Sequence, residues 1–146
     1  VDAFIGNWDR HNGNWGFLYN QETDDMKIAP IYDCGSALFP QIDDELIKKV
    51  LASKAEMNAR VYDMPTSAIL INGKRINYHK MITSLEYDGC NDAIKRIVPL
   101  IDLQKINTLI DSVEQLSELQ KEFLRKILKL RKELILDDAY NKLLEK

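Results

Sequence analysis

The clearest pattern of apolar and polar positions lies in residues 116–146, where apolar side chains recur at steps of three and four. Such spacing aligns the apolar side chains along one face of an α-helix. Ser117 is a suitable N-cap for this helix, and Asp137 could cap a last short helix that carries Tyr140 and two leucines. The apolar stripe comprises Leu116, Leu119, Phe123, Ile127, Leu130 and Leu134.

The charged positions of the same helix lie off the apolar stripe and predict a basic outer surface. A helix with a single apolar face is typically packed on a core with its charges in solvent, and we adopt this interpretation. A helix that binds a partner protein or contacts tRNA is the alternative. The basic positions are Lys121, Arg125, Lys129 and Lys132.

The pattern between residues 43 and 113 predicts further helices separated by short connectors. Asp43 and Asp44 are good N-cap candidates for a helix that reaches about Ala55. Residues 57–65 are expected to form a connector. The apolar face of the first helix holds Leu46, Ile47, Val50 and Leu51. The later helices are expected near residues 79–87, 91–98 and 102–113, with breaks at Asp88-Gly89 and near Pro99.

A β-hairpin is predicted close to the start of the chain. Residues 15–19 form a short strand rich in aromatic side chains, residues 20–25 a polar turn, and residues 27–32 the returning strand. Pro30 cannot donate a backbone hydrogen bond, so the second strand lies at an edge or ends there. Such a hairpin brings its two ends together, and residues on either side of it become neighbours.

Residues 68–78 carry a second hairpin signature. The segment is centred on Asn72-Gly73, the dipeptide most typical of a tight two-residue turn between strands. A turn between two helices is the alternative, because the apolar run is short.

Candidate chemistry is concentrated around the first hairpin. Residues 9–14 read DRHNGN, and Asp33 is followed by Cys34 and Gly35. Protein kinases arrange a catalytic base and two magnesium ligands in this order: an aspartate, an asparagine five positions later, and a second aspartate in a D-x-G turn. Magnesium prefers oxygen ligands and takes one or two protein carboxylates besides the phosphates.

The residue types assign a role to each position. Asp33 fits as a charged magnesium ligand, and Asn14 as a neutral oxygen ligand from the loop. Asp9 could accept the proton of an attacking hydroxyl group. His11 either lines the nucleotide pocket or braces the loop. The flanking Trp8 and Trp15 are interpreted as packing anchors.

Composition adds few constraints. A chain of 146 residues with 45% hydrophobic and 29% charged residues is typical of one globular domain. The net charge of -3 gives no argument for binding nucleic acid or an anionic membrane. Cys34 and Cys90 lack metal-binding spacing, and two free thiols in a cytoplasmic protein is the simplest interpretation. No apolar run approaches the roughly 20 residues needed to span a bilayer.

The loop and the second motif resemble a known family. Residues 6–16 read GNWDRHNGNWG and residues 28–36 read IAPIYDCGS, which is similar to the C-terminal half of HipA-like serine/threonine kinases. This motif-level resemblance covers about the first quarter of the chain, and residues 67–74 also look familiar. It favours helix over hairpin around Asn72.

The resemblance has specific implications. It implies a mainly α fold with a small β-hairpin, the C-terminal lobe of a protein-kinase-like protein, with residues 1–41 holding the site and residues 42–146 a helical bundle. It carries the base onto Asp9 and the magnesium ligands onto Asn14 and Asp33. It places ATP against His11, Asn14, Tyr32 and Asp33. Many HipA-like kinases are bacterial toxins, so an antitoxin-like protein partner is implied beside a Ser/Thr protein substrate.

Phosphoinositide kinases and their protein-kinase relatives share a similar Asp-Arg-His-Asn-x-Asn loop and are the second family considered. The Ala-Pro-Ile-Tyr-Asp spelling of residues 29–33, the modest length and the helical tail favour the HipA-like group.

A complete kinase also needs a strand lysine and a glycine-rich loop from an N-terminal lobe. Asp9 comes so early that no such lobe precedes it, and residues 10–146 contain no glycine-rich phosphate loop. Because Val1 is not methionine, we expect a fragment, with an encoded remnant as the alternative. The chain alone is therefore expected to be catalytically incompetent. A non-catalytic helical module that binds a partner protein is the competing hypothesis.

Overall fold

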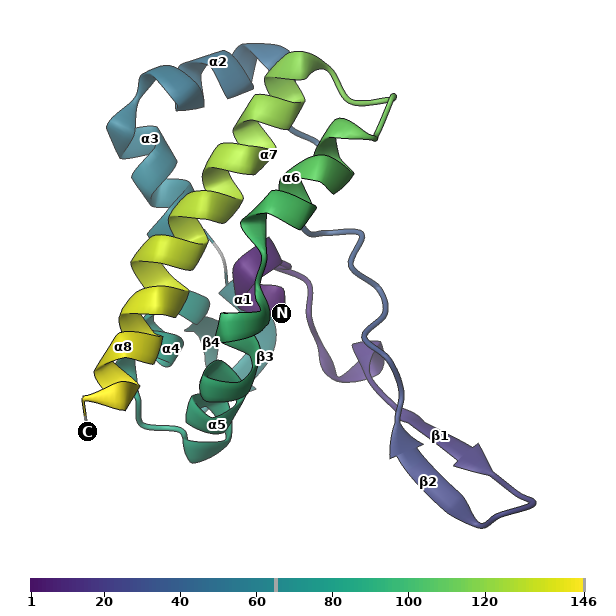
Figure 1. The fold of residues 1–146 in the computed structure, drawn as a ribbon. Coiled ribbons are helices and arrows are strands. Elements are labelled where there is room, and N and C mark those ends of the chain that lie inside the picture. Colours follow the sequence, from purple (N-terminus) through teal and green to yellow (C-terminus); the bar gives the residue numbers. More distant parts are fainter. Residues whose placement is uncertain (65, 146) are drawn as a thin grey trace.

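The computed structural model describes residues 1–64 and 66–145. It shows an elongated helical body from which one β-hairpin projects (Figure 1). The N-terminal elements are α1 (Asp2–Ile5), the 3-10 turn η1 (Asn12–Asn14), β1 (Phe17–Asn20) and β2 (Asp25–Ile28). The body contains α2 (Asp44–Ala52), α3 (Lys54–Asn58), the π-helix η2 (Ala59–Asp63), β3 (Thr66–Ile71), β4 (Lys74–Asn77), α4 (Tyr78–Ser84), α5 (Asp88–Ile97), η3 (Val98–Leu100), α6 (Leu103–Asp111), α7 (Glu118–Arg131), the π-helix η4 (Lys132–Asp137) and α8 (Asp138–Leu144).

The C-terminal helix runs along the whole body, as its periodicity predicts (Figure 1). Ser117 caps α7 by accepting a hydrogen bond from the Gln120 N–H group. The predicted cap at Asp137 is wrong, because Asp137 is itself helical and makes no capping hydrogen bond. The π-helix η4 adds residues to the turn, which leaves Leu134 39% exposed and buries Ile135 instead.

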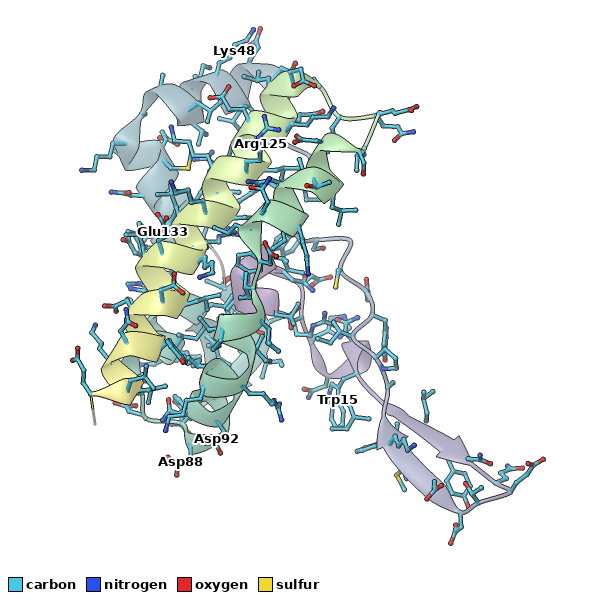
Figure 2. All side chains as sticks on the ribbon, in the orientation of Figure 1. Trp15, Lys48, Asp88, Asp92, Arg125 and Glu133 are labelled. Carbon is cyan, nitrogen blue, oxygen red and sulfur yellow. The ribbon has the colours of Figure 1, made fainter. Side chains whose placement is uncertain are left out.

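The expected basic surface of α7 is largely neutralised. Each of the four predicted cations, three in α7 and Lys132 in η4, lies beside a carboxylate, so these four positions form ion pairs. Figure 2 labels Arg125 and Glu133, which belong to two of these pairs. The pairs are Lys121–Glu118, Arg125–Asp111, Lys129–Glu133 and Lys132–Asp137. This distribution weakens the alternative of a tRNA-contacting surface.

The first helix of the body is shorter than predicted. Asp43 caps α2, as expected, but Ser53 adopts an extended backbone, ends α2 and caps α3. The connector predicted at residues 57–65 is wrong over most of its length, since residues 57–63 are helical. This segment is helical because Met57 and Val61 are buried in the core. Leu46, predicted on the apolar face, is 38% exposed.

The three middle helices lie near their predicted positions. The expected break at Asp88-Gly89 is wrong, because α5 begins at Asp88. The chain breaks earlier, at Leu85, where the backbone is left-handed with φ 58°. The core beneath these helices and α7 is formed by buried apolar residues that include Ile94, Val98, Ile110, Phe123, Ile127 and Leu136.

The structure contains two antiparallel hairpins where the family resemblance implies one. In β3–β4, Asn72 and Gly73 have φ angles of 52° and 74°, the geometry of a two-residue hairpin turn. The helical alternative for this segment is therefore wrong. The first hairpin is shorter than predicted: Phe17 pairs with Ile28, and residues 29–32 lie outside the strands. No helix within residues 1–64 and 66–145 is both long and apolar enough to cross a membrane.

Candidate active site

The loop between α1 and the first hairpin is folded by its own side chains. Nδ1 of His11 accepts a hydrogen bond from the Gly13 N–H group at 3.0 Å. The side-chain oxygen of Asn14 accepts one from the His11 N–H group at 3.1 Å. These two bonds close the short turn η1 and place the buried Asn14 side chain at its end.

The structure brings Asn14 and Asp33 together, although 19 positions separate them. The Asn14 side-chain amide donates a hydrogen bond directly to the Asp33 carboxylate. Asp33 has a left-handed backbone with φ 55°, and its side chain lies at the surface. The hairpin between Asn14 and Asp33 brings the residues at its two ends together, as predicted.

Asn7 links Asp9 to the same region through the backbone. Asn7 is fully buried, and its side-chain oxygen accepts a hydrogen bond from the Asp9 N–H group at 3.3 Å. Its amide nitrogen donates to the Asp33 carbonyl oxygen at 3.2 Å. Tyr78 fixes Asn7 in turn, since its hydroxyl donates to the Asn7 carbonyl oxygen at 2.8 Å. The Asp9 side chain itself is exposed.

Arg10 joins the two halves of the site, and sequence reasoning missed it. Its guanidinium donates at 2.8 Å to the carbonyl oxygens of both Asn14 and Tyr32. It also forms a two-pronged ion pair with Asp2, with both distances 2.9 Å. The hydrogen bond with Asp2 raises the pKa of Arg10 above its ordinary value, so the side chain stays charged. One buried cation therefore sets the spacing between the backbones that carry Asn14 and Asp33.

Tyr32 and His11 flank this pair of side chains. The Tyr32 hydroxyl donates to the Gly13 carbonyl oxygen at 3.1 Å. This bond joins the segment before the hairpin to the segment after it. His11 and Tyr32 are both exposed and are accessible to a ligand. The interpretation of Trp8 and Trp15 as packing anchors is wrong, because they are 48% and 53% exposed. Figure 2 shows Trp15 at the base of the hairpin, outside the helical body.

The donor set fits a magnesium ion in its chemistry. The exposed Asp33 carboxylate lies against the buried Asn14 amide, and carboxylate and amide groups contain the oxygen ligands that Mg²⁺ prefers. The Asn14 amide nitrogen faces Asp33, and the Asn14 oxygen accepts from the His11 N–H group. An ion between the two side chains would therefore replace the Asn14–Asp33 bond and require the amide oxygen to turn toward Asp33. The part of the chain that the structure describes holds no cluster of three or more His, Cys, Asp or Glu side chains suited to a metal ion.

One face of the projecting hairpin is apolar and uncovered. Phe17 lies opposite Ile28, and Tyr19 lies opposite Met26, so all four side chains share a face. Their exposed fractions range from 55% for Phe17 to 73% for Ile28. Trp15 extends this face by packing edge-on against Phe17. We call these five residues the apolar hairpin face, and Trp15 in this face directly follows Asn14 in the chain.

A buried arginine of α7 packs against the start of the loop. Arg131 of α7 is fully buried and donates to the Phe4 carbonyl oxygen at 3.3 Å and to the Arg60 carbonyl oxygen at 2.9 Å. Burial lowers the pKa of Arg131 to about 10. Its guanidinium fills the space beside Gly6, whose φ of 65° lets the chain turn from α1 into the loop. The loop is thus tied to the far end of the chain.

The sequence and the structure were each compared with known proteins. No protein-family model matches the sequence. The chain is 46% identical over 146 residues to the serine/threonine-protein kinase CtkA of Helicobacter pylori strain J99. It covers 99% of this chain and 45% of that kinase.

A comparison with solved structures finds the same kinase. The chain is similar to the crystal structure of a Helicobacter pylori proinflammatory kinase CtkA, with a TM-score of 0.90 and 46% identity. That match covers 99% of this chain and 50% of the solved chain. The chain thus spans about half the length of the relatives it matches, and its fold is that of the matching part of a kinase.

Proposed function

We propose that this chain is the catalytic-loop half of an ATP-dependent serine/threonine protein kinase of the HipA-like group. The observation that carries the proposal is the meeting of Asn14 and Asp33 at the two ends of the first hairpin. The similarity to a serine/threonine-protein kinase over nearly the whole chain supports it. The assignment to HipA-like kinases, and an antitoxin-like partner with it, rests on the motifs in residues 6–16 and 28–36.

Each side chain has a separate task in this proposal. Asp33 and Asn14 would hold Mg²⁺, which neutralises charge on the phosphates of bound ATP. Asp9 accepts the proton of the substrate hydroxyl as that oxygen attacks, and its exposure leaves the carboxylate accessible to a protein substrate. His11 and Tyr32 border the place where the nucleotide would lie.

The rest of a longer polypeptide would supply what this chain lacks. A lysine on a strand of the N-terminal lobe and a glycine-rich loop grip the phosphates in kinases, and residues 1–146 contain no glycine-rich phosphate loop. The apolar hairpin face offers that second half a surface next to the site. An isolated two-stranded hairpin is marginally stable in water, so its apolar side chains gain from being covered.

The test uses the longer polypeptide and two substitutions. Asp9→Asn should leave Mg-ATP binding nearly unchanged and reduce phosphate transfer to a protein by about 100-fold or more, because only the base is lost. Asp33→Asn should weaken Mg-ATP binding itself. Nucleotide binding is measured by fluorescence and transfer by radiolabelled phosphate.

Equal transfer by the wild-type protein and both variants would defeat the assigned roles. The 146-residue chain alone should transfer no phosphate. A chain that binds a partner protein but never Mg-ATP, even when joined to its second half, would instead support the non-catalytic module.

A further inference from the structure

The outer edge of β3 is attached to the loop that carries Asp9. The Ala68 N–H group donates to the Arg10 carbonyl oxygen at 3.1 Å. The Ser67 hydroxyl donates to the same oxygen at 3.0 Å. Because Arg10 directly follows Asp9, this strand edge is continuous with the proposed catalytic loop.

The register of the second hairpin predicts that one residue of this edge makes no backbone hydrogen bond to β4. Ile71 and Lys74 flank the two-residue turn and therefore form the hydrogen-bonded pair next to it. Hydrogen bonding alternates along an antiparallel pair, so Leu70, opposite Arg75, directs its N–H and C=O groups away from β4. The N–H group of Ala68, two positions earlier, also donates away from β4, to Arg10, although the pairing of the two strands shifts in register between Thr66 and Leu70.

A hollow separates this edge from the loop. It has a volume of about 480 Å³ and is lined by His11, Asn12 and Gly13 on one side and by residues 68–70 on the other. Leu70 is 57% exposed and lines this hollow. An edge that presents a donor and an acceptor at strand spacing is complementary to another extended peptide.

We propose that this edge docks the extended segment that carries the acceptor serine or threonine, which pairs with the Leu70 backbone as an added strand. The inference rests on the proposed function and names its substrate site. Ala68 and Leu70 lie about 7 Å apart along the strand at its usual rise per residue. The acceptor hydroxyl should therefore lie about two residues from the peptide residue that pairs with Leu70.

The first test measures peptide binding to the 146-residue chain, independently of catalysis. The probe is the tightest-binding fluorescein-labelled nonapeptide selected from a library with a fixed central serine. Leu70→Pro removes the outward N–H group and should weaken binding about five- to tenfold, as expected for one lost hydrogen bond. Arg75→Pro is the matched control, since it removes the outward N–H group of the opposite edge. It should leave the affinity unchanged.

The second test modifies the peptide and leaves the protein intact, so it also covers a Leu70→Pro variant that fails to fold. Single N-methylation of each peptide amide should weaken binding at alternate positions, most strongly about two residues from the serine. Absence of any binding, a scan without alternation, or equal losses in the two proline variants would overturn the docking edge. Binding that weakens at alternate peptide positions, together with unchanged phosphate transfer in Asp9→Asn, would support the docking edge and contradict the proposed function.

Discussion

Arg10 shows how much of the candidate site depends on one side chain. Its guanidinium contacts Asp2, the backbone of Asn14 and the backbone of Tyr32, each from a different segment. The planar fork of an arginine can serve these partners together, whereas a lysine ammonium is a single point charge. Asp2 and Arg10 are thus positioning residues for the proposed magnesium ligands.

Arg10→Lys should weaken Mg²⁺ binding and lower the free energy of unfolding by about 1–3 kcal/mol, because buried acceptors lose their partners. Urea denaturation measures the stability, and Mn²⁺-induced broadening of the Asn14 side-chain amide signal measures metal binding. Arg125→Lys is the control: it changes an arginine paired with Asp111 at the surface and should cost less than about 1 kcal/mol. Metal binding that survives in Arg10→Lys would contradict the positioning role.

Tyr78 gives a pH-dependent prediction at the same scale. Burial raises its pKa to about 12, while the unfolded chain titrates near the ordinary 10.0. The folded state therefore keeps a proton that the unfolded state loses. Its contribution is fully present below pH 10 and is lost, by about 2–3 kcal/mol, as pH rises to about 12. Urea denaturation at pH 9 to 12 should show this decline in the wild type and a shallower one in Tyr78→Phe; parallel curves would contradict it.

The first hairpin brings separate sequence motifs together and remains largely uncovered. Its four-residue strands pair from Phe17↔Ile28 to Asn20↔Asp25 and project from the body (Figure 1). One face carries aromatic and aliphatic side chains, and the other carries Leu18 opposite Lys27. An exposed apolar patch of this kind marks an interaction surface.

Phe17→Ser on the apolar hairpin face should leave the stability of this chain within about 0.5 kcal/mol, since the side chain is already exposed. It should reduce binding of a hydrophobic dye and self-association. Leu18→Ser on the opposite face is the matched control and should have a smaller effect. Light scattering and dye fluorescence provide the two measurements. A large loss of stability in Phe17→Ser would show that this face is covered within the chain itself.

Sequence patterns predicted some helices and strands correctly and missed others, and the difference has a physical reason. Periodicity and caps located α7 at Ser117, and the Asn72-Gly73 turn located the second hairpin, because these signals are local. The π-helices at residues 59–63 and 132–137 were not predicted, since their burial depends on contacts between distant segments. The convergence of Asn14 and Asp33 followed from the hairpin, but the roles of Asn7 and Arg10 required the folded structure.

On the scale of the whole molecule, α7 near the end of the chain contacts the segment that leads from α1 into the loop. Arg131 reaches Phe4 across 127 positions and lies under the turn at Gly6. The guanidinium also stacks over the Phe39 ring, 5.3 Å from its centroid. Contacts with the helical body therefore help to fix the conformation of the loop.

Gly6→Ala should destabilise the chain by about 1–3 kcal/mol, because a Cβ atom there would overlap the Arg131 guanidinium and strain a left-handed backbone. Thermal denaturation checks this. Gly89→Ala is the control: no atom lies within 4 Å of a Cβ added there, and its helical position should make alanine neutral or slightly stabilising. A Gly6→Ala variant as stable as Gly89→Ala would contradict this close packing.

The most direct test of the central claim is a crystal structure of the longer polypeptide with Mn²⁺ and a non-hydrolysable ATP analogue. Anomalous scattering should place the ion between the Asp33 carboxylate and the Asn14 side-chain oxygen, with their mutual hydrogen bond replaced. A bound nucleotide whose ion is held by other side chains, while Asn14 still donates to Asp33, would contradict the account.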